Sequence, residues 1–320
     1  MSANPATNTN QAKKIGQDWE WNVAVFCQNE AARIGQCIAS IAQAIGTRRA
    51  LVTVVVNGTT DDSAAIAWQA ARAHDLPIEI YRIAHGDKSN AIDQFFYQLR
   101  VPARMYFCVD GYVKIGPRSF EGLAAGLAAR PAAVAATGIA INGRTMPISR
   151  EEILELGGKL QGQLHALRPE FIERMVAQSI ALPIGLYRGD GLLGSMASHD
   201  LDAIGTQWDP SRVVGVAEAT FEIPTLSPFV PRDLRRQFRR KVRQMRGHLE
   251  NAAIKTVIYR RGFAALPAYA DEMIARYLAE HGVPPTPLMD KPFMLLALRQ
   301  HRAARPAAAA KLTPQRVEFP

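Results

Sequence analysis

Cysteine and long apolar runs are both scarce in this sequence of 320 residues. Its three cysteines, Cys27, Cys37 and Cys108, are too few and too scattered for a disulfide framework or a C-x-x-C metal site, so we expect buried thiols. No apolar run reaches the roughly 18 residues that a membrane-spanning helix needs. Residues 1–17 also lack the apolar core of a signal peptide, and we expect them to be disordered. These absences predict a cytoplasmic protein.

Apolar residues and positive charge, by contrast, are plentiful. Hydrophobic residues make up 48% of the chain, which is enough for the packed core of a globular protein. The formal net charge of +9 favours an anionic partner, which can be a nucleotide diphosphate, a lipid surface or nucleic acid. Charge alone does not choose among these partners.

The first half of the sequence alternates short β-rich runs with helical patterns. The predicted strands are 21–27, 51–56, 78–83, 105–109 and 133–141. Between the first two, isoleucines and a cysteine recur at three- and four-residue steps, which predicts a helix that packs one face on a sheet. Further helices are expected over about 61–74, 89–99 and 119–129. This alternation predicts an α/β fold with a mainly parallel sheet.

The second half has a different character. Ser149 and Glu152 form an S-x-x-E capping box, which predicts a helix that begins there and carries leucines at 156, 160, 164 and 167. A Gly-rich segment, 185–194, and a strand-like stretch, 213–223, follow. Residues 303–320 are rich in Ala and Pro and predict a flexible tail.

A strongly basic helix is predicted over residues 232–246. This segment holds seven Arg and one Lys against a single Asp. Apolar residues recur through it at helical spacing, at Leu234, Phe238, Val242, Met245 and Leu249. Its cations are therefore expected on one face and its apolar stripe on the other.

Polar residues follow four successive predicted strands. They occupy positions 28–30, 57–62, 86–89 and 110–112. Each set alone is typical of turns and helix caps. Since ligands of open parallel sheets bind beyond the carboxyl ends of the strands, the recurrence at four strand ends indicates a ligand site there.

Three of these segments carry a family resemblance. VAVFCQNEAARIGQCIASI resembles the opening strand and P-x-Y-N-E turn of inverting family-2 glycosyltransferases, which have the GT-A fold. VVVNGTTDDSAAIA resembles their V-D-x-S-x-D segment, and YFCVDGYVKIGPRSFEGL resembles their D-x-D strand. The likeness covers residues 20–130 and continues more weakly to about residue 250.

The resemblance implies a GT-A-like α/β fold, with a mainly parallel central sheet flanked by helices and a helical C-terminal half. Residues 18–145 are then the half that binds the nucleotide sugar, a UDP-sugar in most of the family. Residues 146–302 are the acceptor-binding half with the basic helix. The implied reaction transfers the sugar with inversion to a hydroxyl of a carbohydrate or lipid-linked acceptor.

The resemblance also assigns site residues. Matching donor-binding positions are Cys27, Glu30, Asn57, Asp61, Lys88, Asp110, Gly111 and Tyr112. Segment 240–247 resembles a weakened Q-R-x-R-W-x-x-G motif and adds Arg240 and Arg243. Glu30, Asn57, Asp61 and Lys88 fall in the base and ribose pocket, and Asp110 falls at the diphosphate. Asp190 matches the acid that ends the acceptor-side segment, which implies a general base.

Two departures from the family pattern bear on chemistry. Tyr112 stands at the second acidic position of D-x-D, so Asp110 is the one acid left there for Mg²⁺ or Mn²⁺. We therefore predict weak metal dependence, with cations of the protein neutralising the diphosphate. Gly189 stands where the family has Glu beside Asp190. Both departures favour, as an alternative, a degenerate protein that binds a nucleotide or an anionic membrane without catalysis.

Three interpretations of the basic helix remain open at this stage. Its arginines can face the donor phosphates, or the helix can dock on the core with its cations solvated. It can also lie on an anionic membrane, which would make the protein peripheral at the inner face of the membrane. Nucleic acid is disfavoured as a partner, because no aromatic residues are interleaved with these cations.

Overall fold

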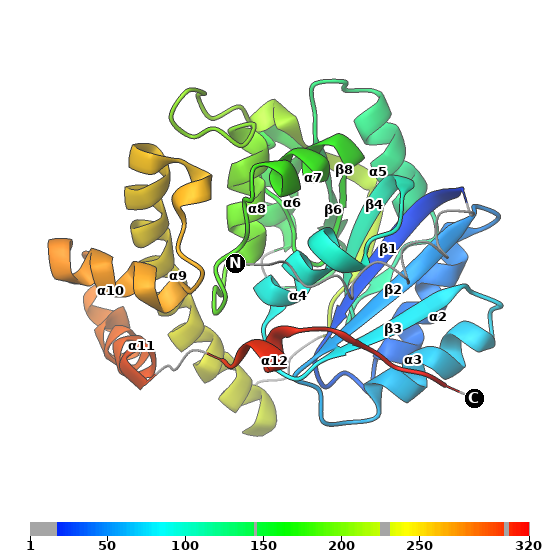
Figure 1. The fold of residues 1–320 in the computed structure, drawn as a ribbon, viewed down its shortest axis with the longest axis horizontal. Helices are drawn as coiled ribbons and strands as arrows, with labels where there is room; N and C mark the ends of the chain where they lie inside the picture. Colours follow the sequence, from blue (N-terminus) through cyan, green and yellow to red (C-terminus); the bar gives the residue numbers. More distant parts are fainter. Residues whose placement is uncertain (1–17, 144–145, 225–230, 304–306, 320) are drawn as a thin grey trace, which may run out of the picture.

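The computed structural model describes residues 18–143, 146–224, 231–303 and 307–319. The N-terminal segment 1–17, predicted to be disordered, lies outside the described residues. In the described part of the chain, nine strands form one sheet in the order β5-β8-β6-β7-β4-β1-β2-β3-β9 (Figure 1). None of the described helices combines the length and the apolar character that crossing a membrane requires.

Four parallel strands form the centre of the sheet. In spatial order they are β4 (Ala103–Asp110), β1 (Trp19–Cys27), β2 (Ala50–Asn57) and β3 (Ile78–Ile83). All four were predicted from the sequence, to within two residues at each end. Every residue of β2 is buried, as expected for a Val-rich strand with helices on both faces. The carboxyl ends of these strands therefore meet along one edge.

The remaining strands extend the sheet beyond β4. They are β5 (Lys114–Ile115), β6 (Ala135–Ala140), β7 (Leu164–Leu167) and β8 (Val213–Glu222). β6 confirms the fifth predicted strand, but it does not pair with β4. β7 lies between them and is antiparallel to both. The sheet is therefore parallel in its first half and mixed beyond β4.

The predicted helix from Ser149 through the leucines at 156–167 is wrong. The chain forms α6 (Met146–Glu151) and a π-helical turn, η3 (Glu152–Leu156), which end at Gly157 and Gly158. Both glycines have positive φ, 64° and 73°, a conformation that terminates helices. Leu160 lies in the loop that follows, and Leu164 and Leu167 lie in β7, whose burial between two strands overrides their helical spacing.

Helices cover both faces of the sheet (Figure 1). One face packs against α2 (Ile34–Ile45), α3 (Ser63–Arg72) and α5 (Ser119–Ala128). The periodic residues Ile34, Cys37, Ile38, Ile41 and Ile45 of α2 are buried there, as predicted. The other face packs against α4 (Lys88–Gln94), the π-helical turn η2 (Phe95–Leu99), α7 (Pro169–Ala177) and α8 (Gly189–Ser198).

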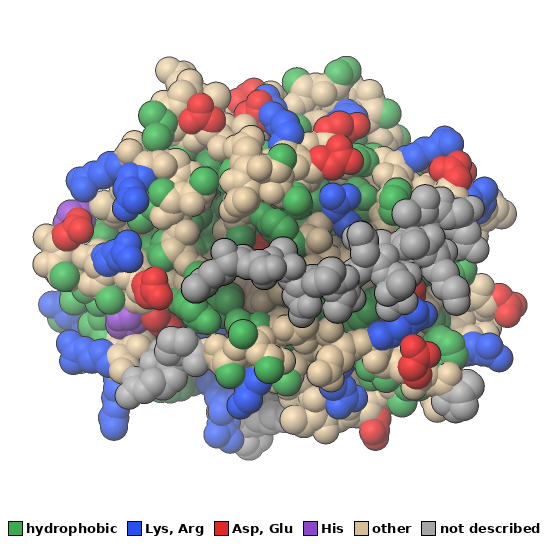
Figure 2. Space-filling model, viewed as in Figure 1, with side chains coloured by type: hydrophobic (Ala, Val, Ile, Leu, Met, Phe, Trp, Pro, Cys, Tyr) green, Lys and Arg blue, Asp and Glu red, His purple; other side chains and the backbone are tan. Residues whose placement is uncertain are grey.

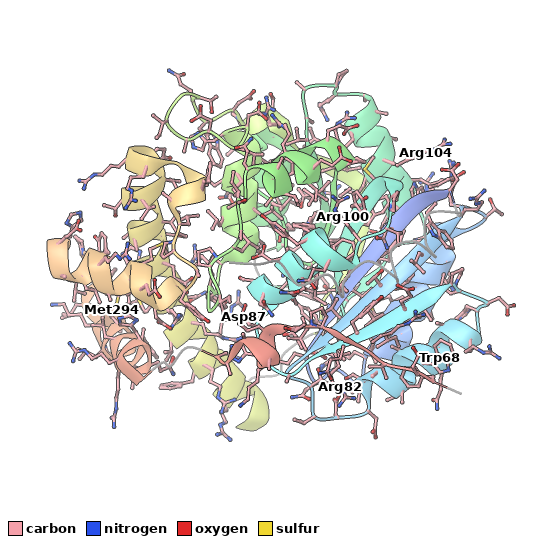
Figure 3. The ribbon with its side chains drawn as sticks, in the orientation of Figure 1. Trp68, Arg82, Asp87, Arg100, Arg104 and Met294 are labelled. Carbon is pink, nitrogen blue, oxygen red and sulfur yellow. The ribbon has the colours of Figure 1, made fainter. Side chains whose placement is uncertain are left out.

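The basic segment lies in α9, a helix of 31 residues (Pro231–Arg261) that extends past the predicted end near residue 246. The turn η5 (Phe263–Ala265) leads to α10 (Ala270–His281), and η6 (Leu288–Asp290) leads to α11 (Lys291–Ala303). Val242 and Leu249 of α9 are buried against Ile274 and Met294. These three helices pack together at one side of the molecule, where Figure 3 labels Met294, and α9 and α10 also join the main core through Ile254, Ile258 and Met273.

The C-terminal segment runs along the edge of the sheet. After α12 (Ala309–Leu312), β9 (Gln315–Arg316) pairs antiparallel with β3. Phe319 then stacks on Trp68, with ring centroids 5.2 Å apart (Figure 3). This packing covers the edge of the sheet at β3. The Ala- and Pro-rich composition of residues 303–320, from which a flexible tail was predicted, gives no sign of it.

The three cysteines are free and buried, as predicted. Burial raises the pKa of Cys27 to about 11 and that of Cys108 to about 12. These thiols are therefore protonated at neutral pH and act as small apolar residues of the core.

Candidate functional site

A cavity of about 890 Å³ opens at the carboxyl ends of the central strands, between the sheet and α9. It collects seven of the predicted site residues from distant parts of the sequence: Glu30, Lys88, Asp110, Tyr112, Asp190, Arg240 and Arg243. The edge of a parallel sheet is where ligand sites of such folds lie. The predicted donor and acceptor residues thus share one cavity.

Lys88 and Asp110 form an ion pair at the floor of the cavity. Asp110 is the last residue of β4, and Lys88 is the first residue of α4. The ammonium of Lys88 also donates a hydrogen bond to the Gly162 carbonyl at 3.1 Å. Burial raises the pKa of Asp110, and Lys88 partly offsets this effect. Burial lowers the pKa of Lys88, but the charges of Asp110 and Asp190 outweigh it and raise the pKa overall. The lysine therefore stays charged.

Tyr112 does not replace the missing carboxylate of D-x-D as a metal ligand. Burial, with the charge of Asp110, raises the pKa of its phenol well above the usual value, so the phenol is neutral. Its oxygen accepts a hydrogen bond of 3.5 Å from Gln163. A neutral phenol is a poor ligand for Mg²⁺ or Mn²⁺, which prefer several carboxylate or carbonyl oxygens.

The cavity therefore does not fit a divalent cation held in the family manner. Asp110 already contacts the ammonium of Lys88, so a metal ion would have to displace a charge of the same sign. In the parts of the chain that the structure describes, no three His, Cys, Asp or Glu side chains are grouped for a metal. Cationic side chains line the cavity instead, at positions 33, 88, 188, 240 and 243.

Asp190 lies in the first turn of α8 and lines the same cavity as Lys88. One carboxylate oxygen accepts a hydrogen bond of 3.0 Å from the Gly191 backbone N–H. The other lies so close to Gly162 that a Cβ there would approach it to 2.8 Å, so only glycine leaves it room. An ionised carboxylate placed here can accept a proton from a hydroxyl bound in the cavity.

The segment that leads into α8 is held by two carboxylates from other elements. Asp87, labelled in Figure 3, accepts a hydrogen bond of 2.7 Å from the Gly185 backbone N–H. Glu250 of α9 is fully buried and accepts hydrogen bonds from the backbone N–H groups of Tyr187 and Arg188, at 3.0 and 3.3 Å. The basic helix thus fixes the segment that carries Asp190.

Arg246 completes this arrangement, which we call the α9 clasp (Glu250 and Arg246). Its guanidinium pairs with Glu250 at 3.0 Å and with Asp271 at 3.1 Å, and donates to the Gly185 carbonyl at 2.9 Å. Burial raises the pKa of Glu250, while the Tyr187 N–H and the charge of Arg246 lower it. The sequence analysis missed the clasp, because a Glu in a basic helix is usually a solvated surface residue.

Four predicted donor residues do not line the cavity. The Asn57 amide donates to the Cys27 carbonyl at 3.2 Å, and the Cys27 side chain is buried. Asp61 accepts from the Ala31 N–H at 3.0 Å, and the Gly111 N–H donates to the Phe26 carbonyl at 2.8 Å. These residues join the ends of β1, β2 and β4, and so they shape the loop that presents Glu30.

The hydrogen bonds to Asp61 also set its ionisation. Burial acts to raise the pKa of Asp61, but hydrogen bonds from Ser63 and the Ala31 N–H outweigh it and lower the pKa. The carboxylate of Asp61 therefore already accepts hydrogen bonds from within the chain. Arg33, which the sequence analysis missed, pairs with Glu30 at 3.0 Å and lines the cavity beside it.

The arginines at the mouth of the cavity differ from Arg33 and Lys88. Among the described residues, Arg188, Arg240 and Arg243 have no carboxylate partner. The Arg243 guanidinium lies over the ring of Tyr187, 5.6 Å from its centroid. Three arginines whose charge is not offset by a carboxylate of the described residues create a positive potential that favours a phosphate-bearing ligand.

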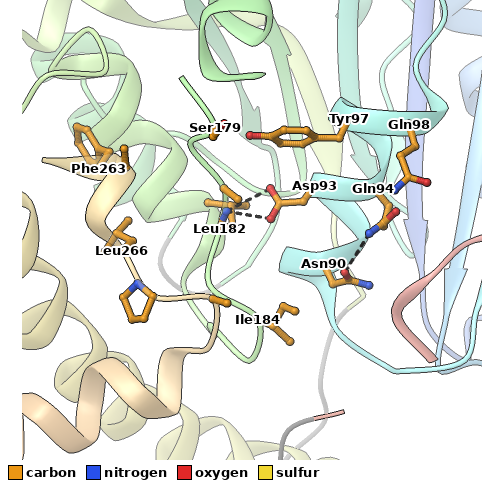
Figure 4. Close-up of a pocket in the computed structure, with 14 residues that line it drawn as sticks. Asn90, Asp93, Gln94, Tyr97, Gln98, Ser179, Leu182, Ile184, Phe263 and Leu266 are labelled. Atoms are coloured by element: carbon orange, nitrogen blue, oxygen red, sulfur yellow. Dashed lines mark hydrogen bonds between the residues drawn. The ribbon is translucent and has the colours of Figure 1, made fainter. Parts of the chain in front are cut away.

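A second cavity of about 340 Å³ lies on the other side of the segment 182–186 (Figure 4). Both carboxylate oxygens of Asp93 face the Leu182 backbone N–H there, at 2.9 and 3.2 Å. Burial raises the pKa of Asp93 well above its usual value. This cavity contains none of the predicted site residues.

No protein-family model and no curated protein matches this sequence. Solved structures do match in three dimensions. The mannosyltransferase PcManGT from Pyrobaculum calidifontis, in complex with GDP-Man and Mn²⁺, has a TM-score of 0.58 at 16% identity, over 94% of this chain and 83% of that one. S. aureus TarS 1-349, in complex with UDP-GlcNAc, has a TM-score of 0.54 at 15% identity, over 88% and 80%.

The fold is GT-A-like. This confirms the predicted α/β class with a central sheet flanked by helices. At 15–16% identity the likeness establishes the fold and not the activity. The function therefore has to be argued from the residues of the cavity.

Proposed function

We infer that this protein is a glycosyltransferase that transfers a sugar from a nucleoside diphosphate sugar to a hydroxyl acceptor. The main support is the shared cavity: Asp190 lies beside Gly162, whose carbonyl accepts a hydrogen bond from Lys88, and the three arginines at the mouth have no carboxylate partner among the described residues. The GT-A-like fold supports the proposal, since both structural neighbours named above were solved with nucleotide sugars. The resemblance to the family-2 group favours a UDP-sugar as donor.

The donor lies across the strand ends in this proposal. Glu30, with Arg33 beside it, contacts the nucleoside through its carboxylate, which can accept bonds from ribose hydroxyls or a base N–H. Lys88, Arg240 and Arg243 contact the diphosphate and take over the role that a divalent cation has in other proteins. Asp110 orients Lys88 toward the phosphates. Asn57, Asp61 and Gly111 act indirectly, through the shape of the Glu30 loop.

Asp190 acts as the general base of the transfer. It accepts the proton of the acceptor hydroxyl while that oxygen forms a bond to the anomeric carbon of the sugar. The bond from that carbon to the diphosphate oxygen breaks on the opposite side, so the configuration inverts. The charge that develops on the leaving diphosphate is stabilised by the arginines at the mouth. The products are the glycoside and the nucleoside diphosphate.

A second candidate is a catalytically degenerate protein that binds the nucleotide alone. It is favoured by Gly189, which stands where the family has a second acid. A Cβ at this position would lie 2.8 Å from the Ser89 hydroxyl, so a carboxylate side chain here would require Ser89 to shift. With glycine at position 189, Asp190 has no neighbouring acid at that position, so any general-base catalysis would depend on Asp190 alone.

Nucleotide-sugar binding and turnover separate these two candidates. Thermal-shift measurements with UDP- and GDP-sugars should identify the donor, since a ligand that binds only the folded state raises the melting temperature. Incubation of that donor with hydroxyl acceptors should then release the nucleoside diphosphate. Stabilisation without release favours the degenerate protein. Release that no acceptor accelerates is hydrolysis of the donor, which shows a catalytic site whose acceptor has not been supplied. No stabilisation by any nucleotide sugar contradicts both.

A cytoplasmic location, peripheral at the inner face of the membrane, belongs to the proposal as well. A lipid-linked acceptor would be reached from there, while a carbohydrate acceptor needs no membrane. Two residues of the apolar stripe of α9, Val242 and Leu249, are buried in the protein, while Phe238 is 53% exposed. Only part of the stripe is therefore available for contact with lipid.

A further inference from the structure

Three large apolar side chains are strongly exposed at the start of α11. Leu288 and Met289 in η6 are 76% and 83% exposed, and Leu295 in α11 is 67% exposed. Leu288 and Leu295 are separated by two helical turns, so they lie along one side. We call this surface, with Lys291 and Arg299, the α11 face. Burying Leu and Met side chains is favourable, so such a cluster is costly to leave in water.

The opposite side of α11 already has its partner. Met294, Ala297 and Leu298 are buried against α9 and α10. The exposed leucines are therefore not needed for the core of this chain. Figure 1 places α11 at the outer edge of the molecule, away from the central sheet. The α11 face is accordingly a surface without a partner within the described residues.

Cations surround these apolar side chains. Lys291 and Arg299 are exposed on α11 itself, at a spacing of four residues on either side of Leu295. Lys241 and Arg239 are exposed on the adjoining part of α9. The nearby Asp290 is paired with Lys241 at 3.4 Å. Figure 2 shows Lys and Arg side chains along the lower left edge, where Figure 1 places α11, with hydrophobic side chains between them.

The two helices also share an aromatic contact beside this face. Phe238 of α9 is 53% exposed, and its ring packs against that of Phe293 with centroids 5.6 Å apart. Phe238 lies two residues before Arg240, which lines the large cavity. The apolar, cationic surface thus borders the helix that forms the cavity mouth.

We propose that the α11 face docks on an anionic lipid membrane. Leu288, Met289 and Leu295 enter the boundary between headgroups and acyl chains, while Lys291 and Arg299 contact lipid phosphates. A membrane is favoured over a protein partner because Lys291 and Arg299 flank Leu295, and because the one acid within the described residues 288–303, Asp290, is paired with Lys241. The inference does not depend on glycosyl transfer, but docking here would bring the cavity mouth close to a lipid-linked acceptor.

Vesicle co-sedimentation of the full chain tests this docking. The probes are vesicles of phosphatidylcholine alone and vesicles that also contain phosphatidylglycerol. We expect binding to the anionic vesicles, weaker binding to the neutral ones, and a loss of affinity as salt is raised. The Leu288→Ser/Met289→Ser double variant should bind about tenfold or more weakly. Lys291→Glu should lose the preference for anionic lipid.

Ile204→Ser is the matched control. Ile204 is 60% exposed and lies in the loop after α8, outside the α11 face, so its replacement should leave vesicle binding unchanged. Melting temperatures and nucleotide-sugar shifts of all variants should match those of the wild type, which excludes unfolding as the cause. Absence of vesicle binding, or equal binding by the double variant, overturns the proposal. A dimer in light scattering that the double variant dissociates would instead assign the face to a second copy of the chain.

Discussion

The buried carboxylate of Glu250 accepts a hydrogen bond of 3.0 Å from the backbone N–H of Tyr187, across 63 positions of sequence. Tyr187 precedes Asp190 by three residues, so this contact holds the start of the helix that carries the proposed base. Arg246 offsets the charge of Glu250 from the same helix, at 3.0 Å. The α9 clasp therefore couples a helix of the second half to the chemistry of the cavity.

Glu250→Gln should lower both stability and turnover. The amide keeps the size of the side chain but removes the charge that pairs with Arg246. Because Arg246 keeps Asp271 as a partner, the loss should be smaller than the roughly 3–5 kcal/mol of a buried charge left fully unpaired. Turnover should fall by about tenfold or more, since the segment that positions Asp190 loosens. Denaturant unfolding and turnover measure the two effects, and Glu272→Gln on the exposed side of α10 is the control. Reduced stability with unchanged turnover would show a purely structural role.

Asp190→Asn should abolish catalysis while leaving donor binding intact. The amide keeps the shape of the side chain but cannot accept a proton, so turnover should fall by roughly 10² to 10⁴. Donor affinity measured by calorimetry should stay near the wild-type value. Asp202→Asn, beyond the other end of α8, is a matched control that should keep full turnover. If Asp190 only caps the helix, its replacement costs roughly 1 kcal/mol of stability and turnover persists.

Removing divalent cations should weaken donor binding only slightly. Asp110 is already paired with Lys88, so EDTA should reduce the affinity by less than about tenfold, or 1.4 kcal/mol. Arg243→Gln should reduce it by about tenfold or more, because a charge-assisted contact to phosphate is lost. Arg260→Gln, exposed near the end of α9, is the control. A hundredfold loss with EDTA, about 2.7 kcal/mol, would contradict the assignment of Lys88 and the arginines.

Acidification should destabilise the fold through His165. Burial, with the charge of Lys88, lowers the pKa of this residue from 6.5 to about 4, and its Nδ1 lies 3.0 Å from the Gln161 carbonyl. Between these pH values the unfolded chain binds a proton that the folded chain does not. The free energy of unfolding should therefore fall as pH drops from 6.5 toward 4, by up to about 3 kcal/mol from this group.

His165→Gln tests this dependence, because Gln does not titrate. Its free energy of unfolding should change less between pH 7 and pH 4 than that of the wild type, whatever the difference at pH 7. His74→Gln replaces an exposed histidine on the surface and should keep the wild-type slope. Equal slopes for the His165 variant and the wild type would rule out the titration of His165 as the cause.

Local patterns were sufficient for the first half of the fold. The runs that form β1, β2, β3 and β4 are short, apolar and bounded by polar turns, and their direction in a parallel sheet follows from the intervening helices. The same logic placed Glu30, Lys88 and Asp110 at one edge. It did not distinguish side chains that face the cavity from those that face the neighbouring loop, as Asn57 and Asp61 do.

The α/β sheet and the polar residues at its strand ends can be predicted from the sequence, since those features depend on neighbours within a few residues. That the leucines of β7 form a strand follows only from the fold, because their partners in β4 and β6 lie far away in sequence. The same holds for the C-terminal segment on β3 and for Glu250. The sequence does not distinguish a buried carboxylate from a solvated one, because the partners of Glu250, Tyr187 and Arg246, are brought to it only by the fold.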